Sequence, residues 1–312
     1  MLVFRLPNRI SMWKLQTCVS SPGPESPLMR DIRLAVFDFD NTLWENVGAH
    51  DRAFMGLVCD LSASSGISQM DIINGMQSVF AEHATMFQYP CAIPCHPALK
   101  AAHPGEDLVQ RYALEVEVFE KLLQSFVKPY DGIFLLLEGL RARGVRLACY
   151  SDASASRVFR QMEELGIGHL FDLVCAADEE DAPFCPDEPV RYVSLEGTCS
   201  FARRMAVNTE HGPKSHLEIL QAILAEMKVR PDQAVMVGDH PIRDVAMARK
   251  CGVVGIYAAW GRKILERLEV LDKVHPYFMR MCAEAKTLSK VDAEFVAEYP
   301  ESILDFLFGD AS

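Results

Sequence analysis

The chain has 312 residues, half of them hydrophobic, and its 31 lysines and arginines against 43 aspartates and glutamates give a formal net charge of −12. This acidic balance argues against a nucleic acid or an anionic membrane as the partner, because both are bound by clusters of basic side chains. The sequence also lacks an uncharged apolar stretch of about 18 residues, which a membrane-spanning helix would need. At about 100–200 residues per domain, we expect a globular cytoplasmic protein, monomer or homodimer, with one core and one large insertion.

Residues 1–28 differ in charge from the rest of the chain. Arg5, Arg9 and Lys14 stand against a single acid, Glu25, and the Ser-Ser-Pro-Gly-Pro sequence that precedes this acid breaks any regular element. We interpret the segment as a dispensable basic extension that is expected to be disordered. A weak mitochondrial targeting signal, and an upstream start followed by true initiation at Met29, are the alternatives.

Five short apolar runs predict buried strands, since each is too short for a helix and is rich in β-branched or aromatic residues. They are Leu34–Phe37, Val145–Tyr150, Phe171–Ala176, Ala234–Val237 and Val253–Ala258. Apolar residues at helical spacing lie between several of these runs, for example Val158, Met162 and Leu165. Strands that alternate with helices in this way predict an α/β fold, a doubly wound parallel sheet with helices on both faces.

One long stretch interrupts this alternation. Residues 45–130 carry several apolar helical faces and no convincing strand, which predicts an α-helical cap domain inserted after the first strand. Helices that simply cover the sheet are the alternative. Ser68 and Asp71 are spaced as a capping pair at the start of one of these helices. Residues 29–44 and 131–312 are then assigned to the α/β core.

Two further segments are less regular, and one cysteine pair is notable. The proline-rich stretch 179–213 predicts a long loop or a small hairpin. Residues 262–312 predict helices and a late strand near Val291–Val296, which pack on the sheet or form an interface. Cys91 and Cys95 suggest a zinc site, but the sequence offers no second pair of ligands at workable spacing to complete a four-ligand set. Unpaired thiols in a reducing cytoplasm are therefore the expected state.

Polar side chains follow three of the predicted strands, at the edge where a doubly wound sheet binds its ligands. They are Asp38, Asp40 and Thr42 after the first strand, Ser151 after the second, and Asp239 and Asp244 after the fourth, and Lys214 precedes a helix. Acids that converge on one site repel each other unless a cation neutralises them, and carboxylate oxygens select Mg²⁺. Lys214 would add a positive charge for a phosphate group. Taken alone, the acids after the first strand could instead cap a helix.

In this chain order, the residues resemble the four motifs of the haloacid dehalogenase-like hydrolase superfamily. The motifs are Asp38-x-Asp40-x-Thr42, Ser151, Lys214, and Gly238-Asp239 with Asp244 five residues after Asp239. The resemblance covers about Met29 to Gly261, and it places the helical insertion where the family has its helical cap. It therefore implies a Rossmann-like core with the site at its strand ends.

The resemblance also implies roles for the acids. Asp38 would be the nucleophile that forms an aspartyl-phosphate. Asp40 would protonate the leaving alcohol and then activate the water that hydrolyses this intermediate. Mg²⁺ would be held by the Asp38 carboxylate, the Asp40 main-chain carbonyl, and the Asp239 and Asp244 side chains.

Five residues are predicted to bind the substrate. By resemblance, Ser151 and Lys214 would hold the transferred phosphoryl oxygens, with Thr42 of the first motif beside them. The long segment between Ser151 and Lys214 is a departure from the family pattern and leaves the alignment of Lys214 open. His240 and Arg243 lie in the loop of the last motif, which places them at the substrate entrance.

The acid at position 40 discriminates within the family. Branches that displace halide or cleave phosphonates lack a carboxylate there, so Asp40 favours a phosphate ester as substrate. We therefore expect a Mg²⁺-dependent hydrolase of phosphoric monoesters, a phosphatase that acts on a small phosphorylated metabolite. A phosphomutase that returns the phosphoryl group to its substrate, and a catalytically silent regulatory binding module, are the alternatives.

Overall fold

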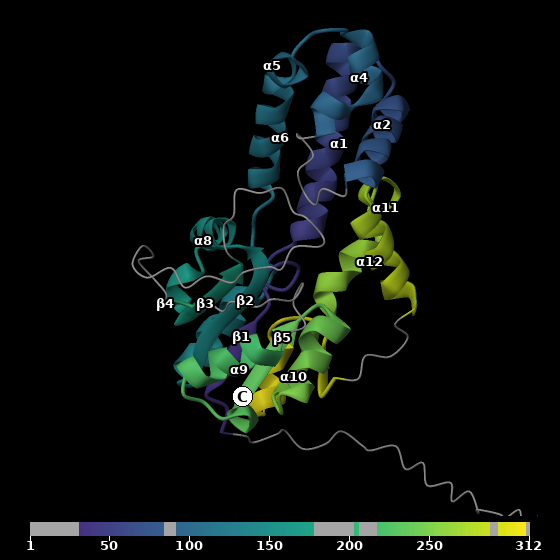
Figure 1. Ribbon diagram of the computed structural model, residues 1–312. Coiled ribbons are helices and arrows are strands. Elements are labelled where there is room, and N and C mark those ends of the chain that lie inside the picture. Colours follow the sequence, from purple (N-terminus) through teal and green to yellow (C-terminus); the bar gives the residue numbers. More distant parts are fainter. Residues whose placement is uncertain (1–30, 84–91, 178–202, 206–216, 288–292, 310–312) are drawn as a thin grey trace, which may run out of the picture.

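The computed structural model describes residues 31–83, 92–177, 203–205, 217–287 and 293–309. Within these residues, parallel strands form one sheet in the order β4-β3-β2-β1-β5-β6-β7 (Figure 1). The strands are β1 (Leu34–Phe37), β2 (Arg146–Ser154), β3 (Leu173–Ala177), β4 (Arg203–Met205), β5 (Ala234–Gly238), β6 (Val254–Ala258) and β7 (Phe295–Ala297). The chain extends the sheet from β1 first in one direction and then in the other. The doubly wound α/β fold predicted from the sequence is therefore confirmed.

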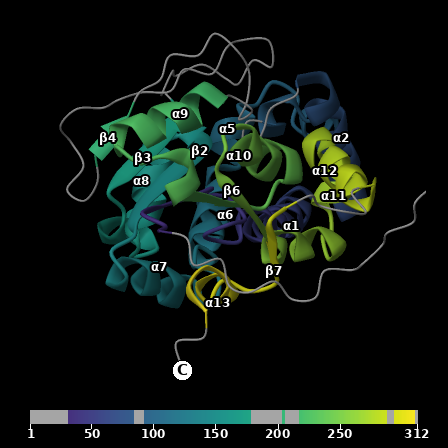
Figure 2. The same cartoon turned by 90° about the horizontal axis from the view of Figure 1, so that it is seen from below.

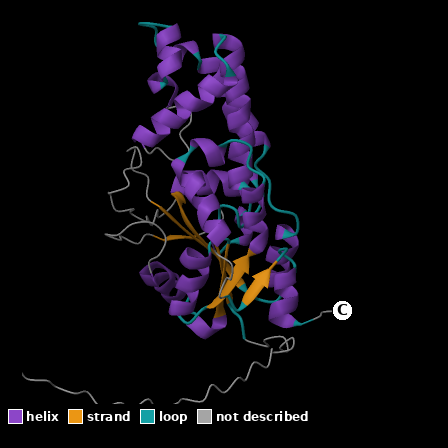
Figure 3. Ribbon diagram, turned by 90° about the vertical axis from the view of Figure 1, so that its right-hand side faces the viewer, coloured by secondary structure: helices purple, strands orange, loops and turns teal. Residues whose placement is uncertain are grey.

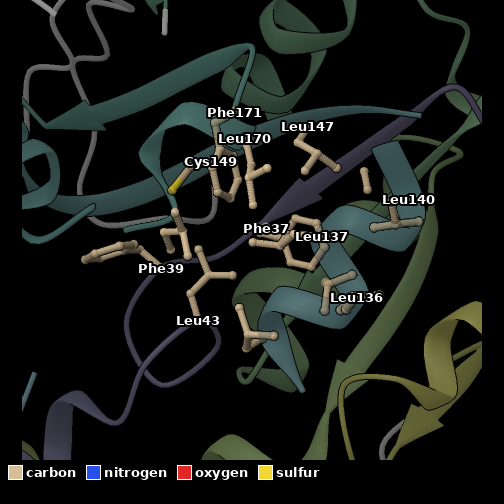
Figure 4. Packing of buried hydrophobic residues seen from close by; sticks show 14 of the residues in the cluster. Phe37, Phe39, Leu43, Leu136, Leu137, Leu140, Leu147, Cys149, Leu170 and Phe171 are labelled. Atoms are coloured by element: carbon tan, nitrogen blue, oxygen red, sulfur yellow. The ribbon is translucent and has the colours of Figure 1, made fainter. Parts of the chain in front are cut away.

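Alternate residues of β1 point to opposite faces of the sheet. Ala35 and Phe37 pack in one buried cluster with α7, α8 and α13, whereas Leu34 and Val36 pack in another with α9 and α10 (Figure 2). These helices are α7 (Ile133–Ala142), α8 (Ala155–Glu164), α9 (Leu217–Glu226), α10 (Met247–Lys250) and α13 (Ser302–Phe308). Figure 4 shows Phe37 among the leucines of α7, and its ring meets Phe171 edge-on with the centroids 6.3 Å apart. Helices thus cover both faces of a strand that is apolar throughout.

Between β1 and β2 the chain forms a helical insertion that extends away from the sheet (Figures 1 and 3). Its helices are α1 (Asn46–Ser65), α2 (Gln69–His83), α4 (Pro97–Ala102), α5 (Leu108–Arg111) and α6 (Ala113–Ser125). Their apolar faces bury a cluster of their own, apart from the two clusters at the sheet. The predicted capping pair is found at the start of α2, where the Ser68 hydroxyl donates to the Asp71 carboxylate at 2.6 Å and accepts from the Asp71 amide at 3.2 Å.

The chain after β6 divides between the insertion and the sheet. The apolar side chains of α11 (Leu271–Val274) and α12 (Pro276–Thr287) join the cluster of the inserted helices, although sequence analysis assigned residues 131–312 to the sheet core. Asp51 of α1 anchors this segment by accepting hydrogen bonds from three successive amides, those of Glu269, Val270 and Leu271, at 2.7, 3.1 and 2.9 Å. The following β7 returns to the sheet and pairs with β6, and α13 packs on α7.

Short helical turns are the remaining elements in the described part of the chain. They are η1 (Ile93–Cys95), η2 (Gly168–Leu170), η3 (Pro231–Gln233), the π-helix η4 (Pro241–Ala246) and η5 (Ala259–Glu266). The described part of the chain holds no helix with the length and hydropathy that a membrane span requires. The basic extension 1–28, the hairpin considered for 179–213 and Cys91 lie outside the described residues, except that Arg203–Met205 form β4.

Candidate functional site

Three acids meet where the direction of winding reverses, between β1 and β5. Asp38 follows β1 directly, Asp239 follows β5 directly, and Asp244 lies in η4, the first turn after β5. One carboxylate oxygen from each lies within 4.8 Å of the other two, and all three side chains are buried. Ligands of doubly wound sheets bind in this crevice. The acids that the sequence proposed as metal ligands are thus brought together, and an all-oxygen donor set of this kind fits Mg²⁺.

A glycine makes room for the third acid. A Cβ atom on Gly238 would lie 2.3 Å from the Cγ atom of Asp244, so a larger residue would displace this carboxylate from the end of β5. The Asp244 Oδ2 atom accepts a hydrogen bond from the His240 amide at 2.8 Å. The Gly-Asp-x4-Asp spacing therefore has a local cause, because the turn after β5 brings the Asp244 carboxylate back against Gly238 and the His240 amide.

His240 and Arg243 lie in the same turn and have different surroundings. The His240 Nδ1 atom accepts from the amides of Ile242 and Arg243 at 3.2 Å each, so the ring caps η4 and a neutral ring carries its proton on Nε2. That Nε2 atom lies 3.9 Å from the carboxylate of Glu284 on α12. The Arg243 side chain is 29% exposed, and its guanidinium lies 3.8 Å from the carboxylate of Asp152. The contact of either residue with substrate stays a prediction.

Thr42 connects the ends of the two central strands. Its hydroxyl donates to Asp38 Oδ2 at 2.9 Å and accepts from the Asp239 amide at 3.1 Å. The residue is completely buried. The structure thus shows Thr42 holding two acids in place, while its predicted contact with substrate stays a prediction.

Asp40 lies at the boundary between the sheet and the insertion. One carboxylate oxygen accepts from the Trp44 indole at 3.1 Å, and the other forms an ion pair with Arg157 of α8. The side chains of Asp40 and Arg157 are 25% and 23% exposed. Behind them, His50 is buried with its Nδ1 atom 3.0 Å from the Asn46 carbonyl oxygen, and burial lowers the pKa of this histidine to about 4.

Ser151 and Lys214 complete the predicted set. Ser151 is buried in β2, next to β1, and its hydroxyl oxygen accepts from the Ala153 amide at 3.1 Å. That contact uses a lone pair, so the hydroxyl can still act as a donor. Lys214 lies outside the described residues, and its role stays a prediction.

The turn after β6 closes the back of the site. The Trp260 indole donates to the Thr42 carbonyl at 3.0 Å, and a Cβ atom on Gly261 would lie 1.9 Å from the carbonyl oxygen of Asn41. The Arg262 Nε atom donates to the Asp239 main-chain oxygen at 2.9 Å and lies 3.1 Å from its Oδ2. The arginine is 8% exposed, so it brings a buried positive charge to the acids. This turn fixes both strand-end loops.

Sequence reasoning missed three of these residues: Arg157, Arg262 and, from α12, Tyr277. Tyr277 forms a hydrogen bond with Arg243. Arg157 lies in the first turn of the helix after Ser151, and this position could have indicated it. Arg262 comes one residue after the stretch that resembles the family, and Tyr277 lies in a helix far from every motif, so no local pattern pointed to either.

Comparisons with known proteins identify the family. A family model of haloacid dehalogenase-like hydrolases matches residues 32–252. The glyceraldehyde 3-phosphate phosphatase of Methanopyrus kandleri is 22% identical over 234 residues, which are 74% of this chain and 85% of that protein. The tyrosine-protein kinase PtkA of Mycobacterium tuberculosis is 25% identical over 254 residues, 81% of this chain and 68% of that one. A proposed beta-phosphoglucomutase from Thermotoga maritima shares the fold, with a TM-score of 0.51, 15% identity, and coverage of 88% of this chain and 98% of that chain.

Proposed function

We propose that this chain, which belongs to the haloacid dehalogenase-like hydrolase family, is a Mg²⁺-dependent phosphatase that hydrolyses a small phosphorylated metabolite. One observation carries the proposal. Three buried carboxylates lie within 4.8 Å at the ends of β1 and β5, and a further acid, Asp40, follows two residues after the first of them. The phosphatase named among the similar proteins supports this reaction type, and the proposal does not extend to its substrate.

Asp38 is the proposed nucleophile, and it would attack phosphorus to form an aspartyl-phosphate. The Thr42 hydroxyl orients its carboxylate, and Ser151 lies in the neighbouring strand β2, two residues beyond the partner of the last β1 residue, where its hydroxyl would donate to a phosphoryl oxygen. Lys214, outside the described residues, would add a cation there. A bound Mg²⁺ would supply the positive charge that phosphoryl transfer requires, held by Asp38, the Asp40 carbonyl and the two acids after β5.

Asp40 is the proposed general acid and base. A quarter of its side chain is exposed, which suits a group that gives a proton to the leaving alcohol and later takes one from water. Trp44 and Arg157 both contact its carboxylate and set its orientation. Arg157 would have to share or release this contact whenever Asp40 carries its proton.

The proposal is tested with a broad panel of phosphate esters, assayed for phosphate release with Mg²⁺ and with EDTA. We expect wild-type turnover that EDTA abolishes and Mg²⁺ restores, and none in Asp38→Asn, whose side chain cannot attack phosphorus. The folded state of the variant is checked by circular dichroism. Hydrolysis by Asp38→Asn at the wild-type rate contradicts the mechanism, and an inactive wild type on the whole panel favours the binding module. A bisphosphorylated intermediate would instead identify a phosphomutase.

A further inference from the structure

The helix α12 contacts the turn that carries Asp244 at two places. Tyr277 forms a hydrogen bond with Arg243, and Glu284 lies 3.9 Å from His240. Positions 277 and 284 are two helical turns apart, so both side chains lie on the same face of α12. On the adjoining face, α12 buries Phe278 in the cluster of the inserted helices, and the Tyr277 ring packs against the same cluster. The helix therefore lies between the insertion and η4, and it presents Tyr277 to the site.

Arg243 and Tyr277 form a fixed, partly exposed pair. Burial tends to lower the pKa of Arg243, but Tyr277, Asp152 and Asp244 outweigh it and raise that pKa, so the guanidinium stays charged. Burial raises the pKa of Tyr277, Arg243 opposes this, and the nearby charges of Asp239 and Asp40 add to the rise. The phenol is thus protonated at neutral pH and lies within electrostatic range of the catalytic acids.

The contact with Asp152 does not use the guanidinium fully. Its distance of 3.8 Å is longer than the ~2.7–2.9 Å of a charge-assisted hydrogen bond. The Arg243 side chain also keeps 29% of its surface exposed, whereas the acids behind it are buried. A planar cation in this position can bind a carboxylate or phosphate oxygen that enters from the side of the insertion.

We propose that Arg243 and Tyr277 form a leaving-group subsite that selects substrates with a second anionic group, a carboxylate or a second phosphate, on the alcohol part of the ester. This subsite rests on the proposed phosphatase function. The transferred phosphoryl group is bound at Asp38, and the second anion is bound by the Arg243 guanidinium and by a hydrogen bond from the Tyr277 hydroxyl. A hydroxyl group in its place would gain no charge interaction and would be the weaker ligand.

The test compares three phosphate esters built on the same two-carbon chain: the phosphate ester of hydroxyacetate, the monophosphate of ethylene glycol and the bisphosphate of ethylene glycol. The first and third separate a carboxylate from a phosphate as the second anion. The second ester, whose alcohol part carries only an uncharged hydroxyl, is the reference and is referred to as the neutral ester. For wild-type protein with Mg²⁺, we expect kcat/KM for at least one anionic ester to exceed the neutral one about 10-fold or more. Hydrogen bonds to charged groups contribute about 1.5–3 kcal/mol, so Arg243→Gln should reduce this preference about 10- to 100-fold.

Tyr277→Phe keeps the ring and should reduce the preference about 10-fold, as expected for one hydrogen bond to an anion. Tyr299→Phe and Arg249→Gln are the matched controls, since Tyr299 is 57% exposed and Arg249 pairs with Glu294 at 3.2 Å. Both controls should keep the wild-type preference. Binding of the same esters to Asp38→Asn by calorimetry gives a second readout that needs no turnover.

Each outcome decides the proposal. A wild type that hydrolyses charged and neutral esters equally overturns it, as does a preference that survives both Arg243→Gln and Tyr277→Phe. Equal binding of the charged and neutral esters to Asp38→Asn likewise overturns it. Absence of turnover on every phosphate ester overturns the proposed phosphatase function and the subsite with it, whereas general turnover without preference overturns the subsite alone.

Discussion

Replacement of Thr42 by valine tests how the two central strand ends are held together. The substitution keeps the shape of the side chain and removes its hydroxyl. Asp38 then loses a charge-assisted hydrogen bond of 2.9 Å, which contributes about 1.5–3 kcal/mol, and the Asp239 amide loses its acceptor at 3.1 Å, which costs about 1–3 kcal/mol. Thr42 is completely buried, so water cannot replace either partner. We expect the free energy of unfolding to fall by about 3 kcal/mol.

The assay is equilibrium unfolding in urea with EDTA present, so that a bound metal does not mask the change. Thr42→Ser is the control, since it keeps the hydroxyl and should recover most of the stability. In the turnover assay, Thr42→Val should lower kcat/KM about 10- to 100-fold, because a loosened Asp38 is no longer held in line for attack. A variant within 0.5 kcal/mol of wild type, on the order of the scatter for surface substitutions, would refute the positioning role. A raised KM with unchanged stability would instead support the substrate contact predicted from the sequence.

Two further predictions concern the insertion. Asp51→Ala removes the acceptor of three amides at the start of α11 and should lower the free energy of unfolding by about 2–4 kcal/mol. Asp60→Ala, also on α1, is the control and should change it by less than about 0.5 kcal/mol. Urea unfolding of both variants checks this, and equal losses would contradict it. Because burial lowers the pKa of His50 from 6.5 to about 4, its neutral form stabilises the fold fully above pH 6.5, and this contribution is lost as the pH falls toward 4. On the order of 3 kcal/mol should be lost over this range in wild type and less in His50→Gln, measured by urea unfolding at several pH values; identical pH profiles would rule out the histidine as the cause.

Much of the central sheet could be predicted because its signals are local. Leu34–Phe37 form β1 with the predicted bounds, and the other apolar runs form strands whose ends are shifted by at most four residues. β2 is the largest departure: it continues to Ser154, past the predicted end at Tyr150, because Ser154 pairs with Ala177 of β3 after a shift in register. Such an extension depends on a partner strand, which the sequence of β2 does not contain.

The contacts of individual site residues were less predictable than their positions. The Thr42 hydroxyl contacts Asp38 and Asp239, which the sequence did not indicate, and its proposed contact with substrate stays a prediction. The His240 ring caps the turn in which it lies, and its proposed place at the entrance stays a prediction. In both cases the spacing along the chain predicted the location, while the direction of the side chain depended on neighbours that arrive from another strand or from the backbone of the turn.

The sequence by itself determined the α/β fold, the edge at which the acids gather and the family to which they belong. It could do so because parallel strands all end at one edge, so residues that follow them in sequence become neighbours in space. Only the tertiary structure decided which distant groups surround these acids: Arg157 against Asp40, Arg262 against Asp239, and Tyr277 against Arg243. Those contacts depend on how helices far apart in the chain pack together, and no local pattern of residues encodes that packing.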